Sequence, residues 1–170
     1  MSLMISLAEA ANAAANVPVD ATQKALVFAA AFASIGFAAI GSAYGTGVAA
    51  SAAIGAWKKC YMQNKPAPFQ LLIFAGAPLS QTIYGMILMF SIMYSDISRP
   101  GVWIAYMTVG VLAGIAMGIS ALLQGTAAAA ASDAFAESGK GFTNLLMSLG
   151  IIETVAIFVM AFAMVLLALI

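Results

Sequence analysis

Long uncharged windows make up most of the chain. They cover residues 25–57, 66–95, 100–132 and 141–170, and only Glu153 interrupts the last of them. A membrane-spanning helix needs about 20 predominantly apolar residues. The pattern therefore predicts four transmembrane helices. The first and third windows are long enough for rods that project beyond the hydrocarbon or tilt within it.

The composition agrees with an integral membrane protein, because 64% of the residues are hydrophobic and only 7% are charged. The remaining connections, at roughly 58–68, 96–100 and 133–141, are too short for a soluble domain. We expect an all-α membrane protein in three segments, which are an N-terminal extension at 1–21, a first transmembrane hairpin at 22–95 and a second at 96–170.

The extension at 1–21 has a short apolar start followed by small residues, which is also how a signal peptide can look. It has no basic residue ahead of the apolar start, so we interpret it as an extension at the membrane interface, with a role in insertion as the alternative. Asp20 or Thr22 is expected to cap the first helix.

The charged residues and the single cysteine exclude several classes of protein. The chain has six Lys and Arg, six Asp and Glu, no His, and one cysteine, Cys60. Scattered charge argues against nucleic acid as a partner. A single cysteine rules out an intramolecular disulfide and a Cys/His metal cluster, and we expect it to be a reduced thiol in a loop. Without a GxxxxGK[ST] phosphate loop, the chain is expected not to be an enzyme itself.

Three lysines set the expected orientation in the membrane. Lys58, Lys59 and Lys65 lie in the first connection, whereas the charges of the second connection cancel. The positive-inside rule then puts the loops at 58–68 and 133–141 in the cytoplasm. Both termini are expected on the opposite side.

The chain contains an internal repeat. The aligned segments are YGTGVAASA at 44–52 with QGTAAAAAS at 124–132, and PLSQTIYGMILMF at 78–90 with GIIETVAIFVMAF at 150–162. Gln81 therefore falls opposite Glu153. The repeat predicts two helical hairpins fused in tandem, in parallel rather than inverted topology.

Small residues concentrate in the first and third windows. Gly41 and Gly45 are four residues apart in the first, and Gly110, Gly114 and Gly118 follow the same spacing in the third. This spacing lets helix backbones pack closely in a membrane. We expect an inner layer of thin helices, an outer layer of bulky ones, and curved packing of copies into a ring. Packing within one four-helix bundle is the alternative.

Glu153 lies inside an apolar run, where an ionised carboxylate costs at least a few kcal/mol unless it is paired, protonated or used. No Lys or Arg lies inside the four windows. The counter-charge must then be a proton, a metal cation or a residue of another subunit. A neutral glutamic acid that hydrogen-bonds across helices is the structural alternative.

Polar residues recur in the neighbouring predicted helices. Ser80, Gln81 and Tyr84 lie within about one turn of each other, Gln124 lies among small residues, and Pro78 disturbs the turn around it. Backbone oxygens near this proline can then face a ligand. A site made only of oxygens favours a hard cation, and one carboxylate is neutralised by a monovalent ion. The residues favour Na⁺ or H⁺.

The segments PLSQTIYG, LLQGTAAAA and IIETVAIF resemble the proteolipid rotor-ring subunit of V-type (V/A-type) rotary ATPases, especially the sodium-transporting prokaryotic branch. The resemblance covers about residues 24–170. It implies that Tyr84 hydrogen-bonds the glutamate, and that Ser80 stands where this branch commonly has threonine. It also implies an Na⁺ site made by Glu153, Gln81, Gln124, Ser80 and the backbone carbonyl of Ala77.

The resemblance also implies a function and partners. Identical copies would form a ring in membrane lipid, and each would carry one ion past a stator subunit of the a/I type with an intramembrane arginine. A central-stalk coupling subunit would meet the cytoplasmic loops. Three alternatives stay open: the same ring carrying H⁺, a four-helix secondary antiporter with one membrane carboxylate, and a structural proteolipid.

Overall fold

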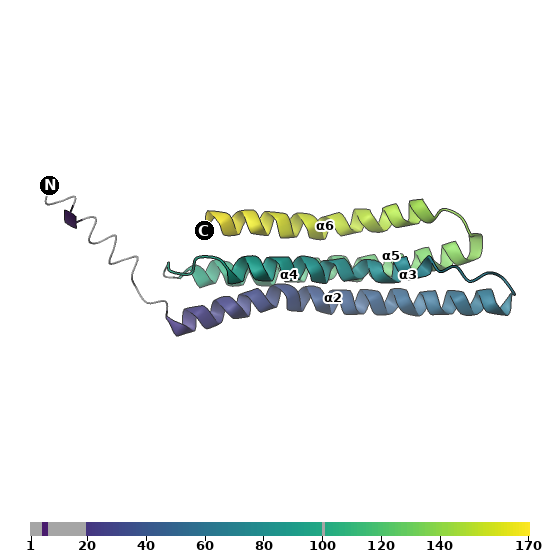
Figure 1. The fold of residues 1–170 in the computed structure, drawn as a ribbon, viewed down its shortest axis with the longest axis horizontal. Helices are drawn as coiled ribbons and strands as arrows, with labels where there is room; N and C mark the ends of the chain where they lie inside the picture. The colour runs from purple at the N-terminus through teal and green to yellow at the C-terminus, as the bar shows by residue number, and fades with distance from the viewer. Residues whose placement is uncertain (1–4, 7–19, 100) are drawn as a thin grey trace.

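The computed structural model describes residues 5, 6, 20–99 and 101–170, and the secondary structure of this part of the chain is entirely helical. Four rods lie side by side along the long axis of the molecule (Figure 1). Their elements are α2 (Ala21–Met62), α3 (Leu71–Gly76), η1 (Ala77–Leu79), α4 (Ser80–Met93), α5 (Val102–Ser138) and α6 (Phe142–Leu169). Each rod is long and apolar enough to cross a membrane, with α3, η1 and α4 together forming the second. The predicted all-α fold with four long apolar helices is confirmed.

The first and third rods are long, as predicted, with 42 residues in α2 and 37 in α5. At 1.5 Å per residue they span about 63 and 56 Å, well beyond a hydrocarbon core of about 30 Å. They also run past the expected starts of the loops, because charged residues end a hydrophobic window without ending a helix. Cys60 therefore lies inside α2 and is buried, and the expectation of a loop thiol was wrong.

Local hydrogen bonds explain where α2 begins and how α4 connects to α5. Asp20 is the N-cap of α2, because its side chain accepts the Thr22 N–H at 3.2 Å. Between α4 and α5, the Tyr106 hydroxyl donates to the Asp96 carbonyl at 2.8 Å. The Ser98 N–H donates to the Asp96 carboxylate at 2.9 Å, and this bond is the main reason why the pKa of Asp96 is lowered. Most of the predicted extension at 1–21 lies outside the described residues.

Glycines bring α2 and α5 into backbone contact. A Cβ added at Gly110 would overlap Ala30, one at Gly118 would overlap Phe37, and one at Gly125 would overlap the backbone of Gly45. The numbers rise together on both helices, so α2 and α5 run in the same direction, as parallel repeats require. The close packing that the glycine spacing predicted is therefore present, whereas an inner layer of a ring stays a prediction.

The bulkier rods cover one side of this glycine-rich pair. Gly85 of α4 lies against Ser34 of α2, and the Ser34 hydroxyl donates to the Gly85 carbonyl at 3.1 Å. The rod α6 packs against both α4 and α5. Large side chains on α6 are exposed, among them Ile151, Phe158 and Phe162. An outward apolar surface of this kind suits contact with lipid.

Candidate ion-binding site

The site is built around a break in the second rod. Pro78 has no N–H to donate, so the chain passes through the 3₁₀ turn η1 between α3 and α4. The carbonyl of Ala77 accepts the backbone N–H of Ser80 and also its hydroxyl, at 3.0 Å. Pro78 is buried and faces Gly45 of α2, where an added Cβ would lie 3.1 Å from the proline ring. The disturbed turn expected at this proline is present.

Glu153 lies in the middle of α6 and receives hydrogen bonds from two other helices. The Tyr84 hydroxyl of α4 donates to its Oε1 at 2.6 Å. The Gln124 side chain of α5 donates from Nε2 to its Oε2 at 3.4 Å. Glu153 itself is only partly buried. Both carboxylate oxygens therefore have partners, and the site lies where α4, α5 and α6 meet.

Two fully buried glutamines continue the network away from Glu153. Gln81 and Gln124 have no exposed surface, and Gln81 donates from Nε2 to Gln124 Oε1 at 2.8 Å. Gln124 donates from its own Nε2 to the Leu149 carbonyl at 3.0 Å. The Ser80 hydroxyl lies 3.2 Å from Gln81 Oε1. All six residues predicted for the site thus lie in one hydrogen-bonded network, which includes the Ala77 carbonyl.

Sequence reasoning missed Ser120. Its hydroxyl donates to the Ile152 carbonyl of α6 at 3.0 Å and lies 3.5 Å from Gln81 Nε2. It precedes Gln124 by four residues, so the two side chains share a face of α5. That spacing was the available signal, although a serine in a membrane helix commonly bonds only within its own helix.

The donor set of this site consists of oxygens and amide N–H groups. No cluster of three or more His, Cys, Asp or Glu side chains exists among the described residues. One carboxylate with amide, hydroxyl and carbonyl oxygens can hold a hard monovalent cation or a proton. A transition metal would prefer nitrogen or sulfur ligands.

The second hairpin carries the likeness to known proteins. Residues 107–166 match the family model of the ATP synthase C-subunit. The match covers about a third of the chain, from early α5 to late α6, and includes Ser120, Gln124 and Glu153. A comparison with curated proteins finds no match. The matched segment thus contains the carboxylate and its partners from α5, whereas the partners from α4 lie outside it.

Proposed function

We propose that the chain is the ion-carrying rotor-ring subunit of a V-type rotary ATPase and that it binds Na⁺ at Glu153. The observation that carries the proposal is the network around this one carboxylate, which joins three membrane helices, two of them in the segment similar to the ATP synthase C-subunit. A carboxylate in this position is useful as a carrier because a bound cation neutralises it. The chain would be a non-catalytic subunit of the complex.

Sodium is favoured over more highly charged ions by the ligands that lie together. The Ser80 hydroxyl is 3.0 Å from the Ala77 carbonyl and 3.2 Å from Gln81 Oε1, so three neutral oxygens are neighbours. With Gln124 Oε1 and the Glu153 carboxylate they make a set of oxygen ligands with a single negative charge. Na⁺ balances that charge, whereas Ca²⁺ would leave a net charge in a medium of low dielectric constant.

In the proposed mechanism, Glu153 binds the ion and Tyr84 holds the Glu153 carboxylate in place. The carboxylate binds the ion, and the hydrogen bond from the Tyr84 hydroxyl holds it toward α4 while the site faces lipid. Beside a stator arginine, the attraction between opposite charges would draw the carboxylate outward and release the ion. The partial exposure of Glu153 leaves it a path to that partner. Rotation would repeat this exchange at each copy.

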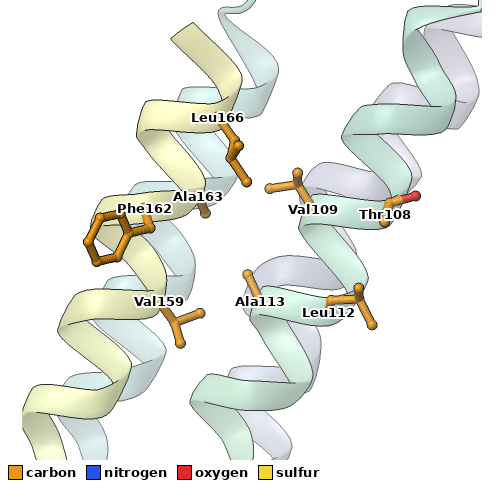
Figure 2. A pocket seen from close by; sticks show the side chains of 8 residues that line it. All are labelled: Thr108, Val109, Leu112, Ala113, Val159, Phe162, Ala163 and Leu166. Atoms are coloured by element: carbon orange, nitrogen blue, oxygen red, sulfur yellow. The ribbon is translucent and has the colours of Figure 1, made fainter. Parts of the chain in front are cut away.

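Assembly into a ring is supported by faces that a single copy leaves open. An added Cβ at Gly47 or Gly55 of α2 would meet no atom within 4 Å, unlike the glycines against α5. Between α5 and α6 runs a groove of about 300 Å³, with Val109 and Ala113 opposite Val159 and Ala163 (Figure 2). In the proposed ring both faces are covered by neighbouring copies.

We further propose that the loops at 58–68 and 133–141 face the cytoplasm and meet a central-stalk subunit. At this end of the molecule Lys59 bridges α2 and α5 through Asp133 at 2.9 Å and Glu137 at 3.6 Å. The ion pairs leave this end polar, in contrast to the apolar walls of the rods. The three lysines of the first loop remain the basis for the orientation.

A proton-carrying ring is the second candidate. It is favoured by one observation, namely that the Tyr84 hydroxyl lies 2.6 Å from Glu153 Oε1. A hydroxyl can accept as well as donate, so a protonated Glu153 would fit by donating its O–H to the Tyr84 oxygen.

Carbodiimide labelling of Glu153 in the purified ring, across pH and with or without Na⁺, tests the proposal. The reagent reacts with a protonated carboxyl group, so Na⁺ should protect Glu153, and the protection should weaken at low pH. Labelling that depends on pH alone would mean that the ring carries H⁺ rather than Na⁺. Absence of labelling under every condition would contradict an ion-carrying role.

A further inference from the structure

Ser120 belongs to the hydrogen-bond network of the site but is not one of the proposed ion ligands. Its side chain is 5% exposed and lies on α5. It connects the side chain of Gln81 on α4 with the backbone of Ile152, the residue next to Glu153. This hydroxyl therefore joins three helices at the level of the site.

Carbonyl groups of α6 set the direction of the hydrogen bonds. The Leu149 carbonyl can only accept, so Gln124 turns Nε2 toward α6 and presents Oε1 to Gln81. Gln81 must then donate from its Nε2 to Gln124 Oε1, at 2.8 Å. Its Oε1 is left facing Ser80, on the side of the proposed cation ligands.

The Ser120 hydroxyl takes part in the same ordering. A side-chain amide nitrogen carries two N–H groups, and Gln124 Oε1 accepts only one of those of Gln81. The proton of Ser120 is directed to the Ile152 carbonyl at 3.0 Å. Its lone pairs therefore face Gln81 Nε2, at 3.5 Å, and can accept the second N–H. Without this acceptor, a fully buried N–H group would lose its partner.

We propose that Ser120 is a positioning residue for ion selectivity. It holds the Gln81 amide so that Oε1 points toward the cation, without itself binding the ion. The inference rests on the proposed function, because it assigns Gln81 Oε1 as a ligand. Loss of Ser120 should weaken Na⁺ binding more than proton binding, since a proton on Glu153 needs no oxygen from Gln81.

The test compares Ser120→Ala with Ser132→Ala in purified rings. Ser132 is a matched control, because it is also buried on α5 but bonds only its own helix, at the Ala128 carbonyl, 2.9 Å away. Two quantities are measured: the Na⁺ concentration that protects half of Glu153 from a carbodiimide, and the pH of half-maximal labelling without Na⁺. Ser120→Ala should raise the first about tenfold, in line with the loss of one buried hydrogen-bond partner. The second should stay near the wild-type value, and Ser132→Ala should change neither.

Two further variants keep the proposal testable if Ser120→Ala does not assemble. Ser120→Thr retains the hydroxyl and should stay within about threefold of the wild type, whereas Ser120→Cys keeps a small side chain with weaker hydrogen bonds and should shift in the direction of the alanine variant. Half-protection by Na⁺ in Ser120→Ala or Ser120→Cys equal to that of Ser132→Ala would overturn the proposal.

The same experiment separates this inference from the proposed function. If the wild-type ring shows no protection by Na⁺, the sodium function fails, and the positioning role of Ser120 for ion selectivity fails with it. If Na⁺ protects the wild-type ring but the half-protection of Ser120→Ala equals that of Ser132→Ala, the sodium function stands and only the positioning role is overturned.

Discussion

The two hairpins share one plan but differ at its centre. In the first, Gln81 is fully buried and follows a break at Pro78; in the second, Glu153 is partly exposed on an unbroken helix, and Gly150 occupies the position aligned with the proline. The first hairpin thus contributes neutral oxygens and a backbone carbonyl, whereas the second contributes the charge.

This difference explains how a chain of four membrane helices can form a site with a single carboxylate. A charge buried in hydrocarbon needs ligands that add no further charge, and amide, hydroxyl and carbonyl groups meet that condition. If both hairpins carried a carboxylate, two like charges would share one site and disfavour each other. Under the proposed function, a protein with one charged hairpin and one neutral hairpin would carry one ion.

The substitution Glu153→Gln makes the second hairpin neutral like the first and should have the largest effect. We expect Na⁺ binding and ion-coupled transport to be abolished, because the only negative charge of the site is lost while the size of the side chain is kept. Ring assembly, followed on native gels, should be intact. Transport that persists in this variant would contradict the rotor function.

A single glycine substitution tests the close backbone contact between α2 and α5. Gly125→Ala places a methyl group into the backbone of Gly45 and should destabilise the fold by about 2 kcal/mol or more. Gly150→Ala is the matched control, because an added Cβ there meets no atom within 4 Å. The temperature at which rings dissociate should fall for the first variant and hold or rise for the second. Equal temperatures would refute the backbone contact.

Tyr84→Phe tests the hydrogen bond by which the first hairpin holds the charge of the second. Loss of the bond of 2.6 Å to Glu153 should raise the Na⁺ concentration for half-protection by about three- to tenfold, equivalent to about 0.7–1.4 kcal/mol. Tyr106→Phe removes a hydroxyl that bonds the Asp96 carbonyl, away from the site. That control should lower thermal stability without changing Na⁺ protection. A change of Na⁺ protection in Tyr106→Phe but not in Tyr84→Phe would contradict the assigned ion site.

Lys59→Gln should have the smallest effect. Its ion pairs with Asp133 and Glu137 join the two hairpins, but all three side chains are more than half exposed. Exposed ion pairs contribute little and are screened by salt. We expect no measurable change in ring dissociation temperature or Na⁺ protection. A clear loss of stability would show that this end of the molecule is less solvated than its exposure indicates.

Much of this architecture could be predicted from the sequence because hydrocarbon tolerates so few patterns. Charge-free windows located the four rods, and the aligned repeats placed Gln81 opposite Glu153. Helix ends were misplaced, since α2 continues through Lys58 and Lys59 to Met62. Motifs of spaced glycines predicted close packing but not the pairing of Gly125 with Gly45, because register depends on both helices together.

The site was predictable by residue type but not in its connections. An intramembrane carboxylate and nearby amides are rare enough to stand out, whereas Ser120 looks like any small residue in a membrane helix. The direction of its hydrogen bonds depends on the Ile152 carbonyl, and the direction of those of Gln124 depends on the Leu149 carbonyl. Both carbonyls come from another helix. Only the packed arrangement of α4, α5 and α6 contains that information.

The most direct test of the central claim is the number of Na⁺ ions bound per chain, measured with radioactive Na⁺ at saturation in purified rings. The division of roles between a neutral and a charged hairpin predicts one ion per chain, and none in Glu153→Gln. Two ions per chain, or one ion that survives in Glu153→Gln, would contradict it.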